Sequence, residues 1–374
     1  MNIQTLSSAR PTPNTQRALR SSLDTMLEQV AERVVERIPG IVGVMLVGSF
    51  ARDEGGFVER QGRLVPYNDL DLVAVVEGQP RRLREPLARL GHELSAEVGV
   101  DVDLWPVARS VLEQPPKTLF WLDVALGGGR MLWGPSGLVP RGRVALREVP
   151  LEEAGRLLAN RATGLALSRL TGASEDPLRF RRHIHKSVLA AGDALLLERR
   201  LYAPNVAARA QKLAELAALD PRLELTSVAY ADAAAFRLRP DLWQAPKHET
   251  AWRELRIALV RNHHLAFEAR RLELAPTLLS VVDGERPMFQ LSDAHPLSRA
   301  RSTALQALVG TSHPDWLHPR ERMARASIAL AYDPDAELAR ASAARWLSVC
   351  ITGDRSVDDQ LLLRGLESIR AQGG

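Results

Sequence analysis

The chain has 374 residues, and 45% of them are apolar, which is enough to bury the cores of two domains. Its 49 lysine and arginine residues are nearly balanced by 45 acidic residues, which gives no strong nucleic-acid-binding signal. No window approaches the roughly 20 apolar residues of a membrane-spanning helix, and the first twenty residues lack the apolar block of a secretory signal. We therefore expect a cytoplasmic protein with no membrane partner.

The N-terminal part of the chain begins with a polar segment, 1–16, which we predict to be a flexible terminus. Over 17–38, apolar residues recur every three or four positions, and this spacing predicts an amphipathic helix. The run 41–47 is apolar and rich in β-branched residues, so it predicts a buried strand, with a turn at Gly48 and Ser49.

The next segments continue this alternation. Glycines and charges over 51–68 predict a turn of helix and an irregular excursion, after which 69–76 resumes as a strand. Pro86 suits the first turn of a helix, and the alternation of Val and Asp within 98–107 predicts a third strand. The order of helices and strands predicts a first domain over 17–145.

Beyond about residue 145 the composition shifts to Ala, Leu, Arg and Glu, and helical spacing recurs to the C-terminus. This pattern predicts a mainly helical domain over 146–374, with a further division near 275–295. The fold class is therefore α+β. Helices are expected near 151–170, 180–200, 206–218, 247–274, 296–309, 319–331, 335–350 and 356–371.

Aspartates alternate with apolar residues in two of the predicted strands. Asp69 and Asp71 project from one face of their strand, about 7 Å apart, and Asp101 and Asp103 repeat the arrangement on a later strand. Such carboxylates repel one another, but they bind Mg²⁺ together with substrate phosphates. The pattern favours a site for a divalent metal and a phosphorylated substrate.

The turn after the first strand has features of a phosphate site. Gly48 allows the backbone to approach a phosphate closely, and Ser49 offers hydroxyl and amide donors. A helix beginning there would direct its N-terminus at the anion.

These motifs, in this order, resemble those of the DNA polymerase beta-like nucleotidyltransferase superfamily. The resemblance covers roughly residues 20–135 and is to the small bacterial branch that includes aminoglycoside nucleotidyltransferases. The motifs that carry it are Val47-Gly48-Ser49-Phe50-Ala51-Arg52, Asp69-Leu70-Asp71-Leu72 and Asp103-Leu104-Trp105-Pro106.

The resemblance implies a short mixed sheet flanked by helices over 17–145, with a nucleoside triphosphate held at Gly48 and Ser49. It also implies that Mg²⁺, or Mn²⁺ in its place, is bound by three catalytic aspartates, which are Asp69, Asp71 and Asp103. Asp103 is preferred over Asp101 because an apolar pair and a proline follow it.

The chain departs from compact family members in two respects. The stretch between Ser49 and Asp69 is longer, and Asp53 stands where a glycine commonly follows Arg52. These departures concern loop shape and substrate choice rather than the fold.

Two basic residues are further candidates for nucleotide binding. Lys186 lies on a predicted helix and either neutralises the triphosphate or is solvated. Arg52 either contacts phosphate or pairs with the neighbouring acidic residues. No metal is assigned to the helical histidines, which are His183, His185, His263 and His264.

We expect an enzyme that transfers an NMP, most simply AMP, from an NTP to a hydroxyl of a small molecule and releases pyrophosphate. Two alternatives remain open. One is nucleotidylation of a protein or a tRNA, as in toxin-like relatives, and the other is a non-catalytic nucleotide-binding module. The acceptor and the base are not specified by the sequence, because fold does not determine function.

Overall fold

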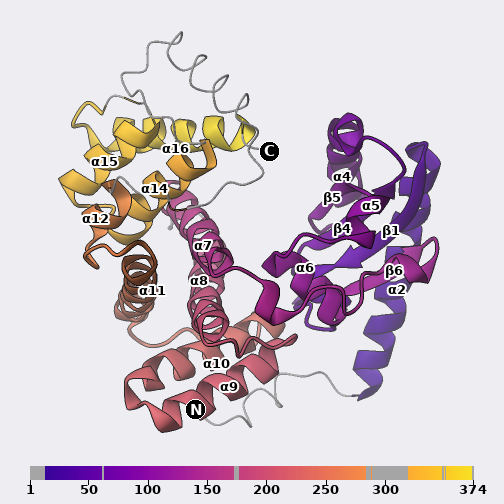
Figure 1. Cartoon of the computed structure of the whole chain (residues 1–374), viewed down its shortest axis with the longest axis horizontal. Coiled ribbons are helices and arrows are strands. Elements are labelled where there is room, and N and C mark those ends of the chain that lie inside the picture. Colours follow the sequence, from indigo (N-terminus) through magenta and orange to yellow (C-terminus); the bar gives the residue numbers. More distant parts are fainter. Residues whose placement is uncertain are drawn as a thin grey trace. The chain divides into compact units, whose positions relative to one another are not determined.

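The computed structural model describes residues 13–60, 63–171, 177–283, 288, 319–347, 349 and 351–372. Contacts divide them into two units (Figure 1). The first unit runs to Pro150 and includes Arg199–Ala245, and the second comprises Leu151–Glu198 and the described residues from Pro246 onward. Most of the predicted flexible terminus, most of the division near 275–295 and the helix expected over 296–309 lie outside the described residues.

The first unit contains a small mixed sheet in the strand order β5-β4-β1-β6. The strands β4 and β5 are parallel, whereas β1 is antiparallel to both of its neighbours, β4 and β6. Three of these strands fall where the sequence predicts them, to within a few residues. The strands are β1 (Ile41–Val47), β4 (Leu70–Val76), β5 (Val102–Ala108) and β6 (Gly129–Trp133).

Two helices, α2 (Pro13–Arg37) and α4 (Arg84–Val98), cover one face of this sheet (Figure 1). Their apolar stripes share a core with alternate strand residues, among them Leu27, Val34, Leu46, Leu70, Leu72, Leu90 and Leu104. Because strand side chains alternate, the residues between these leucines lie on the other face of the sheet. That other face carries Asp71 and Asp103.

Several elements of the first unit were not predicted from the sequence. The excursion after β1 contains a hairpin of β2 (Phe57–Arg60) and β3 (Arg63–Pro66), and β6 adds an edge strand to the sheet. Two short helices, α5 (Arg109–Glu113) and α6 (Leu119–Asp123), were also not predicted, and α6 continues into the π-helical turn η2 (Val124–Gly128). The expected turn of helix after β1 is present as α3 (Gly48–Ala51).

Two helices from later in the chain, α9 (Val206–Leu219) and α10 (Glu224–Leu238), belong to the first unit. This grouping differs from the division predicted near residue 145, which assigned all later helices to one domain. Local periodicity identifies a helix but does not specify the surface against which it packs. The first unit is therefore assembled from two separate stretches of chain.

The second unit is helical throughout its described elements. They are α7 (Glu152–Leu170), α8 (Pro177–Glu198), α11 (Glu249–Leu272), α12 (Leu278–Asp283), α14 (Pro319–Tyr332), α15 (Glu337–Leu347) and α16 (Arg355–Gln372). The predicted fold class, α+β with a mainly helical C-terminal region, is confirmed at this level. Within the described part of the chain, none of the helices combines the length and low polarity that crossing a membrane requires.

The interior of the second unit holds buried titratable side chains. His264 on α11 is fully buried, and its Nδ1 lies 2.8 Å from the hydroxyl of Tyr332. Burial and the nearby Arg271 lower the pKa of His264 to about 3. Burial likewise lowers the pKa of His185 to about 3 and that of His183 to about 4, with basic neighbours adding to the effect. These histidines are therefore neutral in the folded protein at neutral pH.

The free energy of unfolding of the second unit should fall as the pH is lowered from 7 to 5. Unfolded His264 takes up a proton near pH 6.5, whereas the folded residue stays neutral down to about pH 3, so acid favours the unfolded state in this window. Each such histidine contributes a slope of up to about 1.4 kcal/mol per pH unit. Urea unfolding at pH 7, 6 and 5 measures this slope of the free energy of unfolding.

The variant His264→Gln should show a smaller pH slope than the unchanged protein, because one of the titrating groups is removed. His92→Gln is a suitable control, since His92 is exposed on α4 in the first unit. An unchanged slope in His264→Gln would contradict the assignment.

Candidate active site

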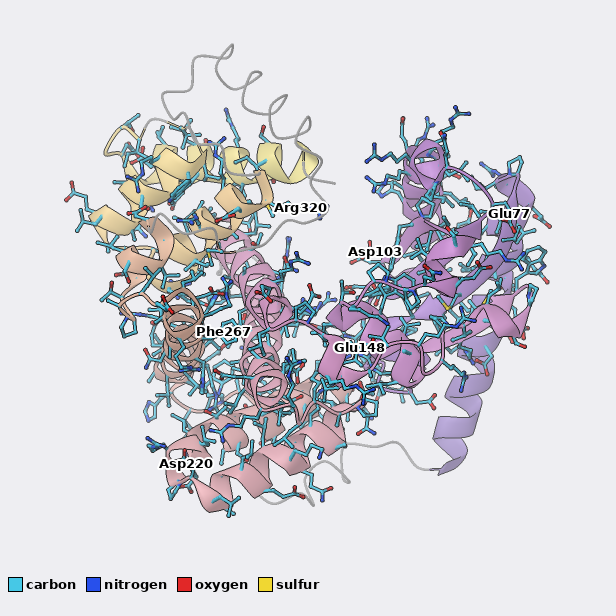
Figure 2. The ribbon with its side chains drawn as sticks, in the orientation of Figure 1. Glu77, Asp103, Glu148, Asp220, Phe267 and Arg320 are labelled. Atoms are coloured by element: carbon cyan, nitrogen blue, oxygen red, sulfur yellow. The ribbon has the colours of Figure 1, made fainter. Side chains whose placement is uncertain are left out.

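The carboxylates predicted on two strands are adjacent in the sheet. Asp71 on β4 is in register with Asp103 on β5, and both alternate with leucines that face the helices. Asp69 and Asp101 immediately precede these strands, where the backbone N–H of Leu70 donates to the carbonyl of Asp101 at 2.8 Å. Asp71 and Asp103 thus lie on one sheet face, at the end opposite Glu77, which follows β4 (Figure 2).

The exit of β1 lies directly beside this pair of carboxylates. Val47 is in register with Asp71 on the other side of β4 from Asp103. Gly48 follows with φ of 72°, and a Cβ atom added to it would lie 2.2 Å from the Oδ2 of Asp71. A Cβ atom here would force the Asp71 carboxylate to move, so both the space and the positive φ favour glycine. The exit of β1, Asp71 and Asp103 therefore form a row across three neighbouring strands, each about 4.8 Å from the next.

The turn after β1 is a single turn of helix. Helix α3 has four residues, so it lacks the aligned peptide dipoles of a long helix. Ser49 is buried, and its carbonyl accepts hydrogen bonds from the N–H of Arg52 at 3.2 Å and of Glu54 at 2.9 Å. A phosphate at this turn would depend on individual backbone and hydroxyl donors rather than on a helix dipole.

Asp53 occupies a position that favours glycine. Its φ is 57°, in the left-handed region, which Asp and Asn tolerate better than other residues with a side chain. Asp53 is the position at which the resemblance noted in the sequence leads us to expect a glycine. The backbone conformation that glycine favours is nevertheless present in this chain.

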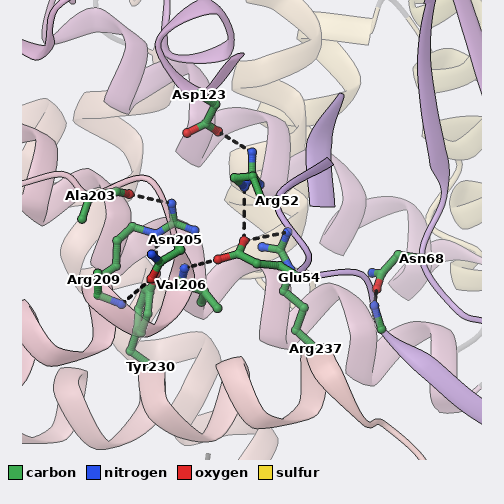
Figure 3. A network of polar contacts seen from close by, with 12 residues as sticks. Arg52, Glu54, Asn68, Asp123, Ala203, Asn205, Val206, Arg209, Tyr230 and Arg237 are labelled. Carbon is green, nitrogen blue, oxygen red and sulfur yellow. Dashed lines mark hydrogen bonds and ion pairs between the residues drawn. The ribbon is translucent and has the colours of Figure 1, made fainter. Parts of the chain in front are cut away.

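A buried network fixes the loop that follows (Figure 3). The Oε2 of Glu54 accepts from the Nε of Arg52 at 3.2 Å and lies 3.8 Å from Arg237 on α10. Its Oε1 accepts from the N–H of Val206, the first residue of α9. The carboxylate of Glu54 therefore joins the exit of β1 to the N-terminus of one helix and to a cation on the next.

Arg52 is held by carboxylates on two sides. Besides Glu54, it pairs with Asp123 at the end of α6, 3.3 Å away, and its side chain is only 10% exposed. Burial by itself would lower the pKa of Arg52, but Asp123 and Glu54 together outweigh it and raise the pKa. This favours the second of the two roles considered for Arg52, namely pairing with acidic residues, and the pairing is buried.

The network continues into α9 and α10 (Figure 3). Tyr202 shares a hydrogen bond of 2.9 Å with Asp123, and its hydroxyl accepts from Arg209 at 2.9 Å. Arg209 is buried and also donates from Nε to the hydroxyl of Tyr230 on α10. Sequence reasoning missed this network because its members lie far apart in the chain: Glu54 contacts Val206, 152 positions later, and Arg237, which is later still. No local pattern signals such a pairing.

The remaining residues singled out from the sequence lie in the second unit. Lys186 is half-buried on α8, so its assignment to the triphosphate stays a prediction. The histidines at 183, 185, 263 and 264 lie on α8 and α11, and burial lowers the pKa of each. Their burial accords with structural rather than ligand roles.

Within the described residues, no three His, Cys, Asp or Glu side chains are arranged to hold a metal ion. Mg²⁺, however, is usually held by one or two carboxylates together with substrate phosphates and water. Asp71 and Asp103, on adjacent strands beside a backbone turn, offer the oxygen donors that such a site needs. The donor chemistry of this pair fits Mg²⁺, with Asp69 immediately before β4 as a third candidate.

Comparison with protein-family models, with curated proteins and with solved structures gives no match to this chain.

Replacing Glu54 with glutamine should destabilise the first unit by roughly 3 kcal/mol, because Arg52 and Arg237 lose a buried counter-charge. Urea unfolding of the full chain measures the change. The control Glu59→Gln alters an exposed side chain on β2 and should stay within about 0.5 kcal/mol of the unchanged protein. Equal free energies of unfolding for Glu54→Gln and Glu59→Gln would show that Glu54 does not stabilise the loop.

Replacing Gly48 with alanine should cost more stability than the matched change Gly99→Ala. The two glycines have nearly the same φ, 72° and 73°, but nothing lies within 4 Å of a Cβ at Gly99, whereas Asp71 blocks one at Gly48. Backbone strain alone costs about 1–2 kcal/mol at each position. Urea unfolding measures the loss of free energy of unfolding in each variant. The loss should be larger for Gly48→Ala than for Gly99→Ala, and this difference should disappear when both changes are made in an Asp71→Ala background. Equal losses of stability for Gly48→Ala and Gly99→Ala, with Asp71 present, would contradict the contact between Asp71 and a side chain at position 48.

Proposed function

We propose that this chain is a metal-dependent nucleotidyltransferase, which moves an NMP, most simply AMP, from an NTP to a hydroxyl of an acceptor and releases pyrophosphate. The observation that carries the proposal is the row formed by the exit of β1, Asp71 and Asp103. It brings a turn that begins with glycine and two carboxylates together on adjacent strands. Phosphoryl transfer needs these two elements, an anion-binding backbone and acidic ligands for a cation.

The chain's own residues take separate roles in this proposal. The backbone at Gly48 and Ser49 receives the triphosphate, since glycine allows the closest approach at this point. Asp71 and Asp103, with Asp69, would hold Mg²⁺. When bound, this ion supplies charge neutralisation for the triphosphate and for the developing transition state. Arg52 acts indirectly, by holding the loop through Glu54 and Asp123.

The proposed reaction is an in-line displacement at the α-phosphorus. The acceptor oxygen forms a bond to this phosphorus, while the bond between the phosphorus and the oxygen bridging to the β-phosphate breaks. Pyrophosphate leaves with the electron pair of that bond. The proton of the acceptor hydroxyl passes to the carboxylate of Asp103, which is exposed on the free face of the edge strand β5.

Pyrophosphate release tests this proposal. The full chain is incubated with each NTP and Mg²⁺ or Mn²⁺, with and without an extract of cellular metabolites. Asp71→Asn and Asp103→Asn should lower the rate by about a hundredfold or more, because each removes a charged ligand while conserving side-chain size.

The matched control is Asp101→Asn. Asp101 is exposed next to β5, one position before its first residue, and its substitution should change the rate by no more than a few-fold. A larger loss of rate in Asp101→Asn than in Asp103→Asn would show that Asp101, rather than Asp103, is the metal ligand on this strand. Equal rates in all variants would rule the proposal out.

A further inference from the structure

The free face of β5 continues beyond Asp103 into an aromatic surface. Strand alternation places Trp105 on the same face as Asp103, about 7 Å further along, and Trp105 is half-buried. The ring of Phe120 lies 6.0 Å from that of Trp105, and Phe120 is 36% exposed. The two rings thus extend the face of β5 that carries Asp103 with an apolar surface.

The position of this surface is fixed by its anchoring. Phe120 lies on α6, whose N-cap Thr118 accepts a hydrogen bond from the N–H of Trp121 at 3.4 Å. At its other end, α6 is held by the pair between Asp123 and Arg52. Phe120 also packs edge-to-face on the buried ring of Trp121, with centroids 4.9 Å apart. The helix that carries Phe120 is therefore held at both of its ends, and the ring itself packs on Trp121.

If the proposed function is correct, the strand order indicates whether the NTP or the acceptor lies beside Trp105 and Phe120. An in-line displacement requires the acceptor to approach from the side opposite the leaving pyrophosphate. With the triphosphate at the exit of β1 and Asp71 in the middle of the row, the opposite side is β5. Trp105 and Phe120 are on that side.

We infer that Trp105 and Phe120 form the acceptor wall, and that the acceptor carries a planar aromatic ring close to its reacting hydroxyl. Aromatic rings gain about 0.5–1.5 kcal/mol from packing on one another beyond the area that they bury. The two residues thus determine specificity, and Asp103 receives the proton of a hydroxyl held beside them.

A matched pair of probes tests the inference, namely phenyl β-glucoside and methyl β-glucoside, which present the same sugar hydroxyls with and without an aromatic ring. Their binding to the full chain is measured by saturation-transfer NMR, with Mg²⁺ and α,β-methylene ATP present. We expect the phenyl probe to bind about five- to tenfold more tightly. Trp105→Leu and Phe120→Leu should each reduce this preference to about twofold or less, and Trp105→Phe should largely retain it.

Trp133→Leu is the matched control, because Trp133 is 39% exposed on β6, the opposite edge strand of the sheet. It should keep the full preference. Thermal unfolding of each variant establishes that it is folded. Equal binding of the two probes, or a preference that survives both Trp105→Leu and Phe120→Leu, would overturn the inference.

Two further outcomes separate the inference from the proposed function. If the phenyl probe and the ATP analogue exclude each other, the rings belong to the donor subsite, and the acceptor assignment is overturned. If the ATP analogue fails to bind in the presence of Mg²⁺ while the ring preference persists, the proposed function fails. The rings then form an aromatic-binding surface unrelated to nucleotide transfer, which also overturns the acceptor assignment.

Discussion

The buried carboxylate of Glu54 is the constraint on which the first unit depends. A carboxylate removed from water is costly unless cations and N–H donors surround it, and here Arg52, Arg237 and the N-terminus of α9 do so. Because these partners come from the β1 exit and from two helices more than 150 residues away, satisfying one charge fixes the path of the loop. The pairing of β1 with β4 places Gly48 against Asp71, and the Glu54 network holds the loop that follows.

The sequence predicted the elements whose periodicity is local. Leucines alternating with aspartates identify β4 and β5 and place Asp71 and Asp103 on one face, as observed. The strand β6 was missed because Gly129 and Arg130 interrupt its apolar run, and α10 was missed because its alanines give little contrast between faces. The sequence suggested only that Glu54 could pair with Arg52, since nothing in the local sequence reveals that Arg237 and Val206 lie beside it.

In the proposed function, the row across three strands would bind a highly charged substrate without a long helix. The β1 exit supplies a turn of only four helical residues, so the attraction for a triphosphate would come mainly from a cation shared between phosphate and carboxylates. In this proposal the substrate phosphates would complete the set of metal ligands. Asp103, on the edge strand, remains accessible for an acceptor.

The central claim is that Asp71 and Asp103 bind a divalent cation jointly with a triphosphate. The most direct measurement is a titration of Mn²⁺ into the full chain, followed by electron paramagnetic resonance, with and without α,β-methylene ATP. The account predicts weak Mn²⁺ binding to the protein alone and much tighter binding of the Mn²⁺-analogue complex than of the free ion, with the gain lost in Asp71→Asn. Binding of the analogue that is indifferent to Mn²⁺, or unchanged in Asp71→Asn, would contradict it.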